Sequence, residues 1–320
     1  MPLYTDCPRN DPNLHDQKEL TYLQDKEFLD LFEPTHPTLL MKIYRFLCFI
    51  VFLGPIKMIL CAIFFFIFYC VVGILPIFRR FFKTNRDFKT WAFYVCRPIV
   101  RMVLFFLGIA HISIKGQIHD YARTIVANHQ SLIETILLLD QFPVSYLAAA
   151  YLQAYKFVVS TSNVFDVVFV DRARRQNISQ HLVDIANDPM LLPVVVFPEG
   201  KVTNGDALVG FRSGAYISET MVQPVAIRYR MWFTPRSMST VAWNEDNFKY
   251  YLYQFFAIPF ITVEINCLEP ISWKGTNKTP QEKAVESELQ IANALGTIAC
   301  SRTNKDYFKL KSEFLHDKAD

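Results

Sequence analysis

A histidine and a glutamate five residues apart are the side chains in this sequence best suited to proton transfer. His129 and Glu134 lie in the run NHQSLIE, which directly follows the apolar, β-branched stretch 124–127. Histidine gains and loses a proton near neutral pH, and this suits a general base. On a regular helix the two side chains would point about 140° apart, so they meet only if His129 lies in the turn before the helix. Glu134 would then hold one ring nitrogen, and the other could take a proton from a hydroxyl.

A second interpretation of the same run is structural. Ser131 and Glu134 have the S-x-x-E spacing of a capping box before an apolar helix, with Ser131 as the N-cap. A capping glutamate and a catalytic glutamate give the same pattern, so the spacing alone leaves both alternatives open.

Three further segments place possible ligand-binding residues on or at the ends of apolar strands. FPEGK at 197–201 combines turn N–H groups with Lys201, which could hold a phosphate or an oxyanion. FVDR at 169–172 ends in Arg172, whose guanidinium could bind a phosphate through two hydrogen bonds. The alternatives are an ordinary turn at 197–201, and a surface ion pair or a lipid-facing basic patch at Arg172. The strand VQPVAI at 222–227 could line an acyl-chain tunnel or belong to the core.

The elements that would position these residues alternate between short apolar strands and helices. A helix is expected over 174–187, and a last helix is expected to begin near Thr279 with a capping box. Strands are expected at 111–115, 123–128, 144–150, 164–170, 193–198, 222–229 and 260–269. This alternation predicts an α/β domain with a central mixed sheet flanked by helices.

The composition is typical of a protein that contacts a membrane, and it argues against several other classes of protein. Hydrophobic residues make up 52% of the 320-residue chain, and the mean hydropathy is +0.17, which is unlike a disordered chain. The net charge is only +3, so the chain lacks the large excess of positive charge that is typical of a nucleic-acid-binding protein. The seven cysteines form no CxxC pair, so no zinc or redox motif is expected.

One long apolar run accounts for much of this hydrophobicity. Residues 46–78 contain a single charge, Lys57, and a straight helix of that length would be about 50 Å long, too long for a hydrocarbon core of about 30 Å. We expect either a helical hairpin turning near Gly54-Pro55 or one span over about 58–78. Basic residues flank the run and place the bulk of the chain in the cytosol. Residues 91–110 would form an interfacial helix or pack on the domain.

Taken together and in this order, the segments NHQSLIE, FVDR, FPEGK and VQPVAI resemble the four blocks of the glycerolipid acyltransferase family. The family includes the 1-acylglycerol-3-phosphate acyltransferases, and the resemblance covers about residues 110–230. TNG at 203–205 and FRSGA at 211–215 are similar to the lysophosphatidylcholine acyltransferase branch, and the ancient ubiquitous protein branch is also similar. Two residues depart from the pattern, because Glu134 replaces the usual Asp and Lys201 replaces a Thr or Ser.

The resemblance implies a role for each matching residue. His129 would be the general base on the acceptor hydroxyl, and Glu134 would orient it. The acceptor's phosphate site would be formed by Arg172, Glu199 and Gly200, with Lys201 as an addition. Acyl-CoA would be the donor and a lysophospholipid or lysophosphatidic acid the acceptor, with no metal or other cofactor. The rival hypothesis is a non-catalytic scaffold of the endoplasmic reticulum or lipid droplet that keeps the fold, whereas a serine hydrolase is disfavoured because the chain has no GxSxG motif.

These expectations divide the chain into five parts. The acyltransferase domain would face the cytosol from an endoplasmic reticulum membrane or a lipid droplet. The parts are a polar N-terminal segment (1–45), a membrane hairpin or span (46–78), a basic linker with an interfacial helix (79–110), the acyltransferase domain (111–300) and a charged tail (301–320).

Overall fold

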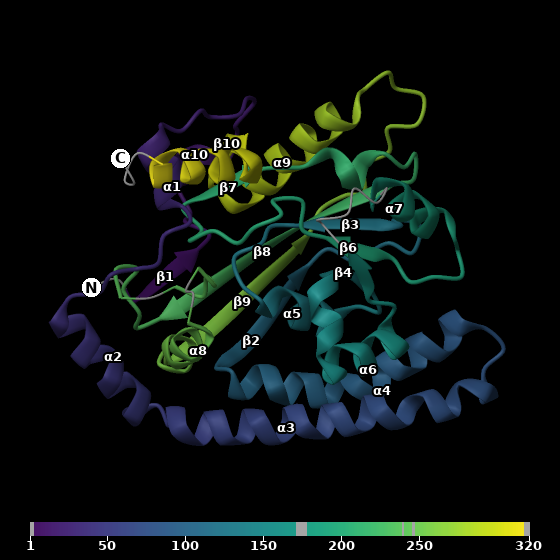
Figure 1. Cartoon of the computed structure of the whole chain (residues 1–320), viewed down its shortest axis with the longest axis horizontal. Helices are drawn as coiled ribbons and strands as arrows, with labels where there is room; N and C mark the ends of the chain where they lie inside the picture. The colour runs from purple at the N-terminus through teal and green to yellow at the C-terminus, as the bar shows by residue number, and fades with distance from the viewer. Residues whose placement is uncertain (1–2, 171–177, 239, 245–246, 317–320) are drawn as a thin grey trace.

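The computed structural model describes residues 3–170, 178–238, 240–244 and 247–316. Within these ranges the chain forms an α/β domain around an eight-stranded sheet (Figure 1). Seven strands follow the order β2-β9-β8-β3-β6-β4-β5, and β1 pairs with β8. Their bounds are β1 Tyr4–Cys7, β2 Ile109–Lys115, β3 Thr124–Ala127, β4 Ser145–Ala149, β5 Val168–Val170, β6 Val194–Val196, β8 Val222–Trp232 and β9 Phe260–Cys267.

The sheet is mixed, as the sequence predicts. Parallel ladders join β2 to β9, β3 to both β6 and β8, and β4 to both β5 and β6. The pairs β8–β9 and β1–β8 are antiparallel. The central strands β3 and β6 are fully buried, which explains why they read as continuous apolar runs. A separate parallel pair is formed by β7 (Ala207–Gly210) and β10 (Ile298–Thr303).

Helices cover both faces of the sheet. In Figure 1, α3, α4, α6 and α8 lie below it, and α9 and α10 lie above it. The α-helices are α1 Asp25–Asp30, α2 Leu39–Val51, α3 Gly54–Ile74, α4 Asn85–Phe106, α5 Ile133–Gln141, α6 Lys156–Phe165, α7 Ile178–Asn187, α8 Phe248–Phe256, α9 Pro280–Leu295 and α10 Asn304–His316. The 3-10 helices are η1 Pro12–Leu14, η2 Leu75–Phe81, η3 Ala150–Ala154 and η4 Ser213–Tyr216.

The expected elements are found, although the helix expected to be the last, α9, is followed by β10 and α10. Of the helix expected over 174–187, residues 178–187 form α7, and 174–177 lie outside the described residues. The strand expected at 164–170 is shorter, because Val164 and Phe165 end α6 and Asp166 adopts a left-handed conformation with φ of 52°. The capping box at the start of α9 is confirmed, with Thr279 and Glu282 each accepting from the other's backbone N–H. Glu282 at this position therefore has a capping role.

The N- and C-terminal segments pack on the domain and on each other. Strand β1 extends the sheet along β8, and Thr21 bridges to Cys300. Phe28 and Phe32 pack with Tyr307 of α10, and the rings of Phe32 and Tyr307 lie 4.1 Å apart. The boundaries expected at residues 45 and 300 therefore separate segments that the structure joins into one folded unit.

The long apolar run is broken where Gly54-Pro55 predicts. Leu53 adopts a left-handed conformation with φ of 57° between α2 and α3. The chain only bends there, and it folds back after Phe81 so that α4 runs alongside α3 (Figure 1). This differs from a hairpin that turns at Gly54. Residues Gly54–Phe81 are the one segment of the described chain that is long and apolar enough to cross a membrane, and most of it faces outward.

Helix α4 packs on the domain, which was one of the two alternatives for residues 91–110. Its buried face includes Phe88, Phe93, Val100 and Leu104, which belong to the main hydrophobic core. Lys57 of α3 donates to the carbonyl of Ile258 at 3.4 Å, so α3 is also held against the domain.

Candidate active site

His129 lies in the turn between β3 and α5, and this turn brings it to Glu134. The Nδ1 atom of His129 is 2.9 Å from Oε2 of Glu134. The Glu134 side chain is fully buried, whereas that of His129 is 21% exposed. The geometric condition set by the five-residue spacing is therefore met, and Nε2 is the ring nitrogen left for a substrate.

Glu134 also accepts from backbone N–H groups at the start of α5, but the expected capping box with Ser131 as the N-cap does not form. The N–H of Ser131 donates to both carboxylate oxygens of Glu134 at 2.9 Å. The helix begins one residue later than expected, with Leu132 as the N-cap. The hydroxyl of Ser131 accepts from the N–H of Ile133 at 3.3 Å and lies 2.9 Å from the hydroxyl of Tyr251.

Asn128 clamps the His129 turn to the neighbouring strand β8. Its Oδ1 accepts from the N–H of Ile227 at 2.7 Å, and its Nδ2 donates to the carbonyl of Ile227 at 2.9 Å. The same Nδ2 donates to Oε1 of Gln130 at 2.7 Å. Because all of these groups are buried, the hydrogen bonds fix the position of the turn closely.

Glu199 of the FPEGK segment supports the histidine turn from the adjacent strand end. Its Oε1 accepts from the backbone N–H of His129 at 2.6 Å, and its Oε2 accepts from the N–H of Val209 at 3.1 Å. Burial raises the pKa of Glu199 well above its ordinary value, and these two backbone hydrogen bonds oppose the rise. Both oxygens face backbone donors, so Glu199 contributes to the site by holding its loops together.

The neighbours of Glu199 frame the histidine and form a tight turn. The ring of Phe197 stacks on the His129 ring with centroids 4.4 Å apart. Gly200 has a φ of 70°, and a Cβ at this position would lie 2.5 Å from Nδ2 of Asn304. A side chain at residue 200 would therefore be excluded by both conformation and space.

Lys201 points its ammonium group at aromatic rings. Nζ lies 5.7 Å from the ring centre of Phe32 and 5.2 Å from that of Tyr307. These are cation–π distances, so Lys201 ties the FPEGK turn to the N-terminal segment and to α10. This role could not be read from the sequence, because the three residues are far apart along the chain.

Arg212 is an exposed cation beside the same turn. Its backbone N–H donates to the carbonyl of Pro198 at 3.0 Å, and its Cδ would lie 3.4 Å from a Cβ placed on Gly200. Arg172 lies outside the described residues. Of the six predicted site residues, the structure thus brings together His129, Glu134, Glu199, Gly200 and Lys201 around the ends of β3 and β6, with the Lys201 ammonium group over the rings of Phe32 and Tyr307.

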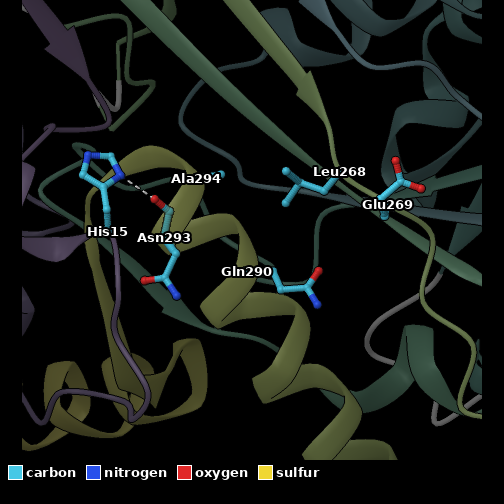
Figure 2. A pocket seen from close by; sticks show the side chains of 6 residues that line it. All are labelled: His15, Leu268, Glu269, Gln290, Asn293 and Ala294. Carbon is cyan, nitrogen blue, oxygen red and sulfur yellow. Dashed lines mark hydrogen bonds between the residues drawn. The ribbon is translucent and has the colours of Figure 1, made fainter.

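A separate surface pocket lies between the N-terminal segment, the end of β9 and α9 (Figure 2). Its lining residues are His15, Leu268, Glu269, Gln290, Asn293 and Ala294. His15 donates from Nδ1 to the carbonyl of Asn293 at 2.7 Å, as Figure 2 shows. These contacts attach the N-terminal segment to α9, and none of the five predicted site residues that the structure describes lines this pocket.

The chain is similar in sequence and in fold to known proteins. Residues 114–228 match the family model described as Acyltransferase. The lysophospholipid acyltransferase LPEAT2 of Arabidopsis thaliana is 30% identical over 141 residues, covering 42% of this chain and 26% of the plant protein. The lipid droplet-regulating VLDL assembly factor AUP1 of Danio rerio is 30% identical over 133 residues, covering 41% of this chain and 30% of the fish protein.

A solved structure extends the similarity to the fold. The 1-acyl-sn-glycerophosphate acyltransferase PlsC of Thermotoga maritima superposes with a TM-score of 0.54 at 18% identity, covering 75% of this chain and 96% of that protein. The chain spans less than a third of the length of the plant and fish relatives. Residues 114–228 carry the match to the Acyltransferase family model and contain the His129–Glu134 pair, and this part of the chain is similar to the lysophospholipid acyltransferases.

Proposed function

We propose that this protein moves a fatty acyl group from acyl-CoA to the hydroxyl of a lysophospholipid or lysophosphatidic acid. The observation that carries the proposal is the His129–Glu134 pair, held at 2.9 Å by a buried hydrogen-bond network within the acyltransferase domain. A partly exposed imidazole backed by a buried carboxylate is the arrangement needed to activate a hydroxyl nucleophile.

In the proposed reaction His129 acts as a general base and then as a general acid. Nε2 takes the proton from the acceptor hydroxyl while Glu134 holds Nδ1–H and stabilises the imidazolium that forms. The acceptor oxygen attacks the thioester carbonyl, and backbone N–H groups stabilise the negative oxygen of the tetrahedral intermediate. The C–S bond then breaks, and the CoA sulfur leaves with the proton returned by His129. No acyl-enzyme forms, because the substrate hydroxyl is the nucleophile.

The acceptor's phosphate is proposed to bind at the Gly200 turn. Glu199 would hold this turn in place, and exposed Arg212 beside Gly200 would supply a positive charge. Arg172 would add a second guanidinium, as the resemblance to the family implies. Lys201 would act mainly by anchoring the turn, because its ammonium group lies over the rings of Phe32 and Tyr307.

The reaction is proposed to occur at a membrane surface, with the domain on the cytosolic side of the endoplasmic reticulum or of a lipid droplet. Exposed apolar side chains on α2 and α3 support this placement, because so large an apolar surface would be unstable in water. They include Leu39, Leu40, Ile43, Phe46, Leu47, Ile50, Ile56, Ile59, Ile63 and Phe66.

A panel of acceptors offered with one acyl-CoA tests the proposal. The full chain would be purified in detergent and mixed with oleoyl-CoA and lysophospholipids that differ in head group, and the products would be identified by mass spectrometry. We expect a diacyl phospholipid from at least one acceptor. If none of the acceptors is acylated, and lysophosphatidic acid is among them, the proposal is wrong.

A second candidate function is a lipid-droplet or endoplasmic-reticulum scaffold that keeps the fold without turnover. The similarity to a relative named as a lipid droplet-regulating factor favours this alternative. The two candidate functions can be distinguished by returning variants to cells that lack the protein. If the protein is a scaffold, the wild-type chain and His129→Ala should restore the cellular function equally. If it is an enzyme, only the wild type should restore it.

A further inference from the structure

Tyr229 on β8 contacts the carboxylate that supports His129. Its hydroxyl donates to Oε1 of Glu134 at 2.8 Å, and the whole side chain is buried. Residue 229 lies outside the segment VQPVAI, and the apolar pattern of that strand gives no sign of a polar contact. The partners are 95 positions apart in the sequence.

The carboxylate of Glu134 is held from two sides. His129 and the N–H of Ser131 approach Oε2, while the N–H groups of Ser131 and Gln130 approach Oε1 at 2.9 and 3.4 Å. In the part of the chain that the structure describes, Tyr229 is the one side chain that donates to Oε1. Without it, Oε1 would keep only backbone donors from its own loop.

Tyr229 is itself held firmly by the sheet. It pairs with Val263 of β9 on one side and with Cys7 of β1 on the other. Burial raises the pKa of Tyr229 well above its ordinary value, so its hydroxyl keeps its proton and stays a donor at any working pH. A phenol fixed in a sheet is a more rigid support than a residue on a loop.

We propose that Tyr229 is a positioning residue for the catalytic pair, which orients the Glu134 carboxylate and moderates the charge that this carboxylate presents to His129. The proposal rests on the proposed function for its effect on turnover, but its effect on His129 does not depend on turnover. Among the described residues, the other titratable groups that interact electrostatically with Glu134 are Cys7 of β1, Glu199 after β6 and Tyr251 of α8.

Tyr229→Phe tests the role because it removes the hydroxyl and keeps the ring. Tyr146→Phe on β4 is the matched control, since Tyr146 is also buried and its hydroxyl has no hydrogen-bond partner among the described residues. The histidine ring signals would be followed by 15N NMR against pH in the full chain in bicelles, with His129→Ala used to assign the His129 signal. Steady-state kinetics would be measured on the same variants.

Without the hydrogen bond from Tyr229, the negative charge of Glu134 is less neutralised and stabilises the protonated His129 ring more strongly. We expect the pH midpoint of the His129 signal to move upward by about half a unit or more in Tyr229→Phe, and kcat to fall about tenfold with a much smaller change in KM. Tyr146→Phe should match the wild type in both measurements.

The outcomes separate the two proposals. A merely structural role would lower the Tm of Tyr229→Phe while leaving the His129 midpoint in place, and an unchanged midpoint would overturn the inference. If the wild type acylates no acceptor but the midpoint moves as expected, the proposed function fails and the positioning role of Tyr229 stands.

Discussion

At the scale of single residues, Glu134 shows how one side chain can contact both a histidine and the start of a helix. The family's usual Asp is one methylene shorter, and here the longer side chain reaches His129 from α5 while still accepting from Ser131 at the start of the helix. Sequence spacing predicted both roles as alternatives. The structure contains both a contact with His129 and one with the N–H of Ser131, which the spacing could not predict because this depends on how tightly the turn closes.

Glu134→Gln tests whether the catalytic role is real. The amide oxygen can still accept from the N–H of Ser131 at the start of α5, but the neutral side chain cannot stabilise an imidazolium by charge. We expect kcat to fall by about a hundredfold or more. Glu282→Gln is the control, because Glu282 accepts from a backbone N–H at the start of α9, as Glu134 does at the start of α5. Similar activity in both variants would show that Glu134 is only a capping residue.

Arg212→Ala tests the proposed phosphate site. The loss of an exposed guanidinium beside Gly200 should raise the KM for the lysophospholipid about tenfold and leave the KM for acyl-CoA nearly unchanged. Arg212→Lys should restore the wild-type value only in part, since an ammonium lacks the planar fork.

Lys274→Ala serves as a control for the charge change, because Lys274 is also exposed and lies in the loop before α9. Equal effects of Arg212→Ala on both substrates would assign Arg212 a structural role.

At the scale of elements, the strands and the order of the motifs follow from the sequence, but the contacts between distant elements do not. The strand-end positions of His129 and Glu199 could be predicted because each follows a buried apolar run. The contact of Lys201 with Phe32 and Tyr307 could not, since it depends on two terminal segments meeting at one turn. Local sequence patterns specify the helices and strands, whereas the packing between them decides which side chains come into contact.

Helix α9 contributes a buried carboxyl group whose ionisation should weaken the fold. Burial raises the pKa of Glu288 to about 8, and its Oε2 accepts from the N–H of Phe211 at 2.9 Å. The folded state therefore keeps a proton that the unfolded state loses above its ordinary pKa. Stability is unaffected below about pH 4.5 and falls as the pH rises toward 8.

Glu288→Gln removes this pH dependence. At pH 8 the variant should exceed the wild type in free energy of unfolding by on the order of a few kcal/mol, and the gain should shrink as the pH is lowered to 5. Thermal unfolding of both proteins across this pH range checks the expectation. A gain that does not change with pH would contradict it.

At the scale of the whole molecule, the sheet restricts how the chain can meet a membrane. Strand β1 pairs with β8, so the residues before the apolar run and the domain after it form one folded unit. A single span that placed residues 1–45 in the lumen would separate these two strands. The structure therefore favours a placement in which the residues before α2 and the domain after α4 lie on the same side of the membrane.

Protease protection in intact microsomes tests this placement, with one epitope tag at residue 1 and another at residue 320. We expect both tags to be digested without detergent. Protection of the N-terminal tag alone would show a single span and would be incompatible with the β1–β8 pairing.

The central claim is that His129 removes the proton from an acceptor hydroxyl, and single-turnover acyl transfer by His129→Ala tests it most directly. The variant would be compared with His111→Ala, which changes an exposed histidine on β2, using oleoyl-CoA and the best acceptor of the wild type. We predict that His129→Ala slows transfer by about 10²–10⁴-fold with an unchanged Tm, while His111→Ala behaves as the wild type. Transfer by His129→Ala at a rate near that of the wild type would contradict the account.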